Sequence, residues 1–154
     1  MPHPSPFTPA ERIESAKVAI AGGLVAGFIG LAWLLLSRYA QAEVSWAGLR
    51  GGWSLANLTL LVNGEIAALS GSLFALTYRY AIRQDDNPQL RSGVVLAFTL
   101  VRGLAEVDAS SAIAQHFWPF FTAGGESFLL FGGCAIALNF AFAQQWLKLF
   151  GTDA

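Results

Sequence analysis

The residues that could do chemistry are one base and two acids that follow an apolar stretch. Residues 94–101 are apolar and long enough for the first half of a bilayer span, and Arg102, Glu106 and Asp108 come directly after them. A charge at the centre of a bilayer costs at least about 2.5–3.5 kcal/mol on insertion scales, so it rarely faces lipid. We therefore expect another part of the chain to supply partners, and Glu65 is a suitable acid.

Depth along each helix indicates which of these groups can meet. A helix rises about 1.5 Å per residue, which places Glu65, Arg102, Glu106 and Asn139 roughly 14–22 Å from the basic ends of their spans, near the middle of a bilayer. Arg102 and Glu106 share a helix face because they are four residues apart. The sequence predicts an intramembrane polar cluster of Glu65, Arg102, Glu106 and Asn139. Asp108 joins it only through a kink or another helix, or else reaches the outer headgroups.

Three roles stay open for this predicted cluster. Arg102 could bridge Glu65 and Glu106 and lock two spans together. The acids could instead form a proton or ion path, or the cluster could bind a polar lipid, a pigment or a partner subunit. With three acids and one base in low dielectric, we expect at least one acid to be protonated or to hold a cation.

No motif of an enzyme or a metal site accompanies the cluster. The histidines, His3 and His116, are far apart, and Cys134 is the single cysteine, so neither an internal disulfide nor a cysteine-rich metal site can form. His116 could ligate a pigment, although a lone interfacial histidine is more often just an interface residue. We expect no catalytic residue, no metal and no cofactor, with a pigment or a lipid as the alternative ligand.

Composition places the chain in the membrane class. Of its 154 residues, 55% are apolar and 12% charged, about half the charged share of a soluble domain. The net charge of −1 comes without a basic block, which excludes an electrostatic footprint for nucleic acid.

Four apolar stretches predict an all-α fold, an integral membrane four-helix bundle. The predicted spans lie in a domain of residues 9–150, between tails at 1–8 and 151–154, and cover about 18–37, 53–78, 94–118 and 127–147. Thr8, Pro9 and Glu11 have the types and spacing of a helix start. Trp118 and Pro119 are expected to end the third span, and Gly124 with Gly125 to form the next turn.

The first span has two further features. Gly23 and Gly27 form a GxxxG pair, which lets another helix approach closely, although small residues are common in membrane helices generally. Residues 40–42 have the small-x-small shape of a signal-peptide cleavage site. The apolar run is longer than the usual 7–15 residues of such a peptide, and Arg38 follows it, so a membrane span is the favoured interpretation.

Basic residues orient the predicted bundle. Four spans put both termini on one side, which then carries Arg12, Lys17, Arg79, Arg83, Arg91 and Lys148. The opposite side carries only Arg38 and Arg50. By the positive-inside rule, both termini face the cytoplasm or the stroma.

Part of the chain resembles a known family. The segments are LTYRYAIR at 76–83, DNP at 86–88, GVVLAF at 93–98 and LVRGL at 100–104. Over roughly residues 50–110 they resemble a family of small four-helix thylakoid membrane proteins of cyanobacteria and plastids whose function is unknown. The resemblance implies a thylakoid membrane and carries over no catalytic residue. Without it, a bacterial inner membrane is the expected location.

These expectations combine into two hypotheses of function. The first is a non-enzymatic integral membrane protein that assists the assembly or organisation of photosynthetic or other membrane complexes. It uses Arg79, Arg83 and Arg91 as an exposed contact loop. The rival is a small proton- or ion-conducting protein that uses the intramembrane carboxylates. The expected partners are membrane lipid and a membrane protein complex or a second copy of the chain, and not nucleic acid.

Overall fold

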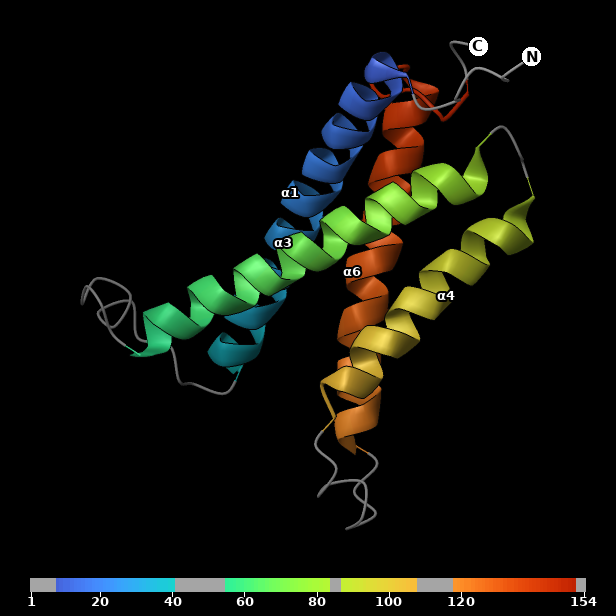
Figure 1. Cartoon of the computed structure of the whole chain (residues 1–154). Helices are drawn as coiled ribbons and strands as arrows, with labels where there is room; N and C mark the ends of the chain where they lie inside the picture. The colour runs from blue at the N-terminus through green and yellow to red at the C-terminus, as the bar shows by residue number, and fades with distance from the viewer. Residues whose placement is uncertain (1–7, 41–54, 84–86, 108–117, 152–154) are drawn as a thin grey trace, which may run out of the picture.

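The computed structural model of the chain describes residues 8–40, 55–83, 87–107 and 118–151. These ranges form four helices, and no strand occurs in them (Figure 1). The helices are α1 (Pro9–Ala40), α3 (Leu55–Ile82), α4 (Pro88–Ala105) and α6 (Trp118–Ala143). The predicted all-α fold is confirmed for this part of the chain.

Three of the helices are long and apolar enough to cross a membrane, and the stretches that qualify are Pro9–Tyr39, Leu58–Ile82 and Trp118–Ala143. At about 1.5 Å per residue, α1, α3 and α6 measure roughly 48, 42 and 39 Å, more than the roughly 30 Å of a hydrocarbon core. α4 has 18 residues. Its length of roughly 27 Å falls just short of that thickness.

The helix of the predicted third span, 94–118, ends earlier than predicted, and residues 108–117 of that span lie outside the described residues. α4 ends at Ala105, and the backbone N–H of Glu106 closes the last turn by donating to the carbonyl of Arg102 at 3.1 Å. At the near end, the helix begins at Pro88 behind the predicted Asn87 cap, whose side chain accepts from the N–H of Gln89 at 3.0 Å. The cap prediction is therefore confirmed.

The fourth span begins earlier than the predicted residue 127. Trp118 and Pro119 start α6 instead of ending the helix before it. Proline fits there because the N–H groups in the first turn of a helix have no partner within the helix. The N–H that proline lacks would therefore not have formed a hydrogen bond in the helix. The predicted turn at Gly124 and Gly125 is therefore wrong, because both residues lie within α6.

α1 and α3 cross at close range through small side chains. A Cβ added to Gly71 would contact Ala26 and lie 2.7 Å from the carbonyl oxygen of Gly22, and one added to Gly22 would lie 2.8 Å from that of Gly71. Gly23 and Gly27 of the predicted GxxxG pair face Ala68 in the same interface. The prediction that these two glycines let another helix approach closely is confirmed, and that helix is α3.

The other helices join around a cluster of aromatic rings. The ring of Phe74 on α3 lies 5.3 Å from that of Phe98 on α4 and 5.2 Å from that of Phe131 on α6. Phe98 and Phe131 are themselves 5.4 Å apart in an edge-on contact. Such pairs add to the hydrophobic gain of burial. α1 also packs on α6, and α4 packs mainly on α6 (Figure 1).

The start of α1 and the segment that follows α6 lie at the same end of the bundle (Figure 1). α6 ends at Ala143, before the predicted residue 147, and Gln145 adopts a left-handed φ of 58° that turns the chain. The following segment returns across the start of α1, where the N–H of Gly151 donates to Glu11. Thr8 caps α1 as predicted, since its hydroxyl accepts from the N–H of Glu11 at 3.3 Å.

Candidate functional site

Among the described residues, the most deeply buried charged group is Arg79, near the end of α3, with no exposed surface. Its Nη2 lies 2.6 Å from Oε2 of Glu11, Nη1 donates to the Ser15 hydroxyl at 2.7 Å, and Nε donates to the Lys148 carbonyl at 2.8 Å. Glu11 and Ser15 are four residues apart on α1 and so present their side chains on one face. Arg79 therefore joins three parts of the chain that are far apart in sequence.

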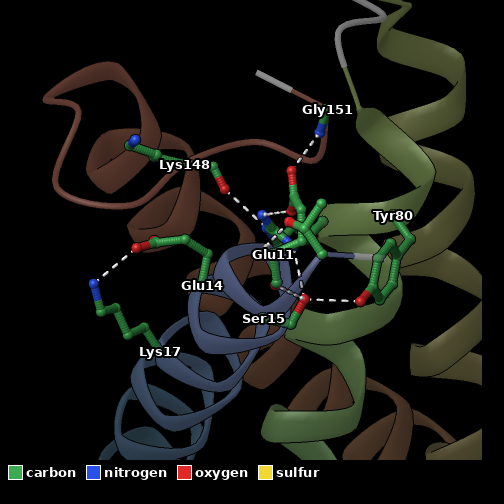
Figure 2. A network of polar contacts seen from close by, with 9 residues as sticks. Glu11, Glu14, Ser15, Lys17, Tyr80, Lys148 and Gly151 are labelled. Carbon is green, nitrogen blue, oxygen red and sulfur yellow. Dashed lines mark hydrogen bonds and ion pairs between the residues drawn. The ribbon is translucent and has the colours of Figure 1, made fainter. Parts of the chain in front are cut away.

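Two partners of Arg79, Glu11 and Ser15, each have a further contact, as Figure 2 shows. Ser15 and Tyr80 share a hydrogen bond of 2.7 Å between their hydroxyls, and Oε1 of Glu11 accepts from the N–H of Gly151 at 3.0 Å. The ring of Phe150 covers this cluster, 5.0 Å from that of Tyr80. All three guanidinium nitrogens are satisfied within the protein, so we assign the network a structural role.

The predicted contact loop of Arg79, Arg83 and Arg91 is wrong for Arg79, which is fully buried. Arg83 is exposed, and its guanidinium lies 5.4 Å from the centre of the Phe150 ring. Arg91 is half-buried on α4. Sequence reasoning missed Glu11 as the partner because an acid in the first turn of a helix is an ordinary surface feature.

A second polar cluster lies at the opposite end of the bundle, around Arg102. Its Nη2 lies 2.6 Å from Oε1 of Glu106, so the predicted pairing across one helical turn is confirmed. The same nitrogen lies 3.5 Å from Oε1 of Glu126 on α6. Arg102 thus links α4 to α6.

Glu65 is not part of this cluster, and the prediction that it pairs with Arg102 is wrong. Its side chain lies on an exposed face of α3, while Gly64 and Ala67 on the same helix are buried. Successive helical residues are about 100° apart, so packing Gly64 inward turns Glu65 away. Glu126 takes its place. The sequence analysis did not predict Glu126 as a partner of Arg102, because Gly124 and Gly125 were predicted to form a turn, which would place Glu126 in a loop.

Asn139 and Asp108 are the two remaining residues that were predicted to belong to this cluster. Asn139 belongs to the other half of the bundle, where its Oδ1 accepts from the Tyr78 hydroxyl at 3.1 Å, so its predicted place beside Arg102 is wrong. Asp108 lies outside the described residues.

A small polar cavity adjoins Arg102. It has a volume of about 150 Å³, and its lining includes Asn63, Arg102, Glu106 and Glu126. One base faces two acids there, so the cavity carries one excess negative charge if all three groups are ionised. Within the described ranges, no group of three or more histidine, cysteine, aspartate or glutamate side chains could hold a metal.

A larger groove lies between α4 and α6, with Tyr78 of α3 in its wall. Its volume is about 460 Å³. The lining residues on the two helices are Pro88, Arg91, Ser92, Val95, Leu96, Phe128, Gly132, Ala135, Ile136 and Asn139. The groove forms because α4 touches α6 near Gly103, where an added Cβ would lie 3.1 Å from Cα of Gly124, and diverges toward its own first turn (Figure 1).

Arg79 and Arg102 are each matched by a carboxylate, and the groove between α4 and α6 is apolar over most of its length. Comparison of the chain with protein-family models, with curated proteins and with solved structures gives no match.

Proposed function

We propose that this chain is an integral membrane protein that acts without catalysis, in the assembly or organisation of membrane complexes. Membrane integration is supported by apolar side chains exposed along every described helix, of which Leu24 on α1 (71%), Leu69 on α3 (66%) and Ile136 on α6 (72%) are examples. Monomeric soluble proteins rarely expose contiguous apolar surface on this scale, whereas a bilayer covers it.

The observation that carries the partner function is Glu65. It is an exposed acid within the candidate span Leu58–Ile82, and its neighbours Leu61, Val62, Ile66 and Leu69 are exposed too. A carboxylate that faces lipid at that depth costs at least about 2.5–3.5 kcal/mol. A hydrogen-bond donor or a base on another membrane protein removes that cost. We therefore assign the α3 face around Glu65 as the contact surface.

We propose the cytoplasmic or stromal side for both termini. The end of the bundle where α1 begins carries Arg12, Lys17, Arg79, Arg83, Arg91 and Lys148, and the positive-inside rule supports this orientation. The family resemblance would make the membrane a thylakoid; without it, a bacterial inner membrane is the proposed location.

The test combines extraction with site-specific cross-linking in native membranes. The chain is expected to stay in the membrane under alkaline extraction. A photo-reactive residue in place of Leu69, one turn from Glu65, is expected to cross-link to a membrane protein, and the same residue in place of buried Phe74 is not. Release by alkali, or equal cross-linking from both positions, would contradict the proposal.

Glu65→Gln separates association from folding. We expect at least a fivefold lower yield of the cross-linked partner, because a neutral amide forms weaker hydrogen bonds than a carboxylate. Helical content is expected to stay unchanged, since Glu65 is exposed. Glu14→Gln is the control, because it removes an acid that pairs with Lys17 at the polar start of α1.

The cavity at Arg102 favours a second candidate function, proton or ion conduction. The excess acid there could hold a proton or a cation. Glu126→Gln would then abolish flux into liposomes while the protein stays folded. An unchanged flux in this variant would exclude conduction through the cavity.

A further inference from the structure

We infer that the first half of α3 binds a membrane-spanning helix of another protein, and that this helix places a lysine or an arginine beside Glu65. The inference rests on the proposed function, which assigns the α3 face around Glu65 as a contact surface. It goes further because it names the chemistry of the partner, which is a basic side chain carried by a helix inside the hydrocarbon region.

Glu65 carries a carboxylate that no group in the described part of the chain matches. It forms no hydrogen bond and no ion pair with a described residue. Each of the other acids in the described ranges lies within 3.5 Å of a base, and the pairs are Glu11 with Arg79, Glu14 with Lys17, and both Glu106 and Glu126 with Arg102. The charge of Glu65 is therefore available to a group on another molecule.

The depth of Glu65 argues against a lipid headgroup as its partner. The candidate span begins at Leu58, and the helix rises roughly 10 Å from there to Glu65. Lysine and arginine can reach an interface from inside a span through their long side chains, but glutamate has only two methylene groups. A base that pairs with Glu65 therefore has to come from a protein segment within the bilayer.

The surface around Glu65 has the form that helix packing uses. Leu61, Glu65, Leu69 and Leu73 follow one another at intervals of four residues, and all of them are exposed. Such rows form the ridges that fit into the grooves of a second helix. α3 diverges from α4 and α6 toward its own start, so neither of these helices covers the row (Figure 1). Lipid tails would cover the leucines but leave the carboxylate unmatched.

A second copy of this chain does not supply the base. The exposed lysines and arginines in the described ranges all belong to the end of the bundle where α1 begins, and they are Arg12, Lys17, Arg83 and Lys148. Along α3, Arg83 is roughly 27 Å from Glu65, so a copy in the same orientation keeps its bases at another depth. A symmetric pair of copies that met at this face would bring two Glu65 carboxylates together, and these repel each other.

The first test uses synthetic membrane-spanning peptides as partners of the full chain in phosphatidylcholine liposomes. The peptides are leucine–alanine helices with one arginine, glutamine or glutamate roughly 10 Å from one end, and energy transfer between labels measures binding. Wild type is expected to bind the arginine peptide at least about fivefold more tightly than the glutamine peptide. Glu65→Gln is expected to lose this preference, and Glu65→Lys is expected to prefer the glutamate peptide.

Glu14→Gln is the matched control for the peptide test. It removes an acid that already pairs with Lys17, so the preference for the arginine peptide is expected to stay as in wild type. Circular dichroism checks that each variant keeps its helical content, which is expected because Glu65 is exposed.

Cross-linking locates the contact without any change at Glu65. A photo-reactive residue in place of Leu61 or Leu73 is expected to capture the arginine peptide, whereas one in place of Ile136, which is 72% exposed on α6, is not. In native membranes, the helix captured from Leu61 is expected to carry a lysine or an arginine within one turn of the cross-link.

Equal binding of the arginine and glutamine peptides by wild type would overturn the inference, as would equal capture from Leu61 and Ile136. A native partner helix without a base at the cross-link, or a second copy of the chain there, would also overturn it and leave the proposed function intact. The proposed function fails separately, if alkali releases the chain or if the α3 face captures no membrane protein in native membranes.

Discussion

Two acids in the first turns of α1 show how burial changes the contribution of a carboxylate to stability. Glu11 faces buried Arg79 at 2.6 Å, whereas Glu14 pairs at 2.7 Å with Lys17, whose side chain is mostly exposed. Removing one partner of a buried pair leaves the other charge uncompensated, while an exposed pair contributes little because water and salt screen it.

We therefore expect Glu11→Gln to lower the free energy of unfolding by about 3–5 kcal/mol. Glu14→Gln on the same helix should change it by less than about 1 kcal/mol. Unfolding in mixed micelles with increasing SDS, followed by circular dichroism, measures both. Equal losses would mean that the Arg79 network does not have the structural role assigned to it.

The Arg102 cluster allows a similar comparison between acids on two helices. Glu126→Lys would place a second cation next to Arg102. Two like unit charges 4 Å apart repel by roughly 4 kcal/mol near a protein surface, and partial exposure to solvent reduces this repulsion. We therefore expect Glu126→Lys to lower the free energy of unfolding in detergent by about 2 kcal/mol. Glu65→Lys exchanges one charged side chain for another on a face of α3 that turns away from Arg102, so it should change the free energy of unfolding by less than about 0.5 kcal/mol. The reverse order would restore Glu65 as the partner of Arg102.

At the level of whole helices, α1 and α3 can cross at close range only because glycines without a side chain lie at the crossing. Gly22 and Gly71 face each other so closely that a methyl group on either would meet the backbone of the other. Such contacts drive association of membrane helices, since lipid tails remove the hydrophobic driving force between them.

We expect Gly71→Ala to destabilise the protein by about 1–3 kcal/mol, the usual range for overpacking. Gly125→Ala adds the same methyl group to α6 in open space and should be neutral or stabilise by up to about 1 kcal/mol through helix propensity. Unfolding in SDS compares the two. A harmless Gly71→Ala would show that the helices can separate without loss.

If the whole bundle spans a bilayer, as we propose, its exposed side chains determine how well it inserts. Leu24→Glu changes a residue that is 71% exposed in the middle of α1. In water such a surface change stays within about 0.5 kcal/mol, but facing lipid it costs at least about 2.5–3.5 kcal/mol. We expect Leu24→Glu to reduce the membrane-inserted fraction at least tenfold in a glycosylation-mapping assay.

Ile13→Glu provides the contrast, since Ile13 is 59% exposed but lies in the polar first turns of α1. Insertion is expected to remain as in wild type. If both variants inserted equally well, the exposed face of α1 would not be in contact with lipid.

Local patterns in the sequence were sufficient for the four helices and for two of their starts. Apolar content predicted the long helices, and the capping residues Thr8 and Asn87 marked two starts correctly. The pairing of Arg102 with Glu106 also follows from sequence, because it needs only helix geometry over four residues.

The rotation of each helix about its axis required the packed structure. α3 turns its small residues toward α1, and this rotation leaves Glu65 on an exposed face within the candidate span Leu58–Ile82. The spacing of Gly64, Ala67, Gly71 and Ala75 could have revealed that face, since it repeats the small-residue pattern of α1.

Burial of Arg79 could not be foreseen from the sequence at all. Its ion-pair partner Glu11 is 68 residues away, and Lys148 is 69 residues away in the other direction. Helix propensity, caps and turns act over about four residues, so they determine which segments are helical. Which side chains then meet depends on how closely those helices approach and how each is turned, and that is set by contacts across the whole chain.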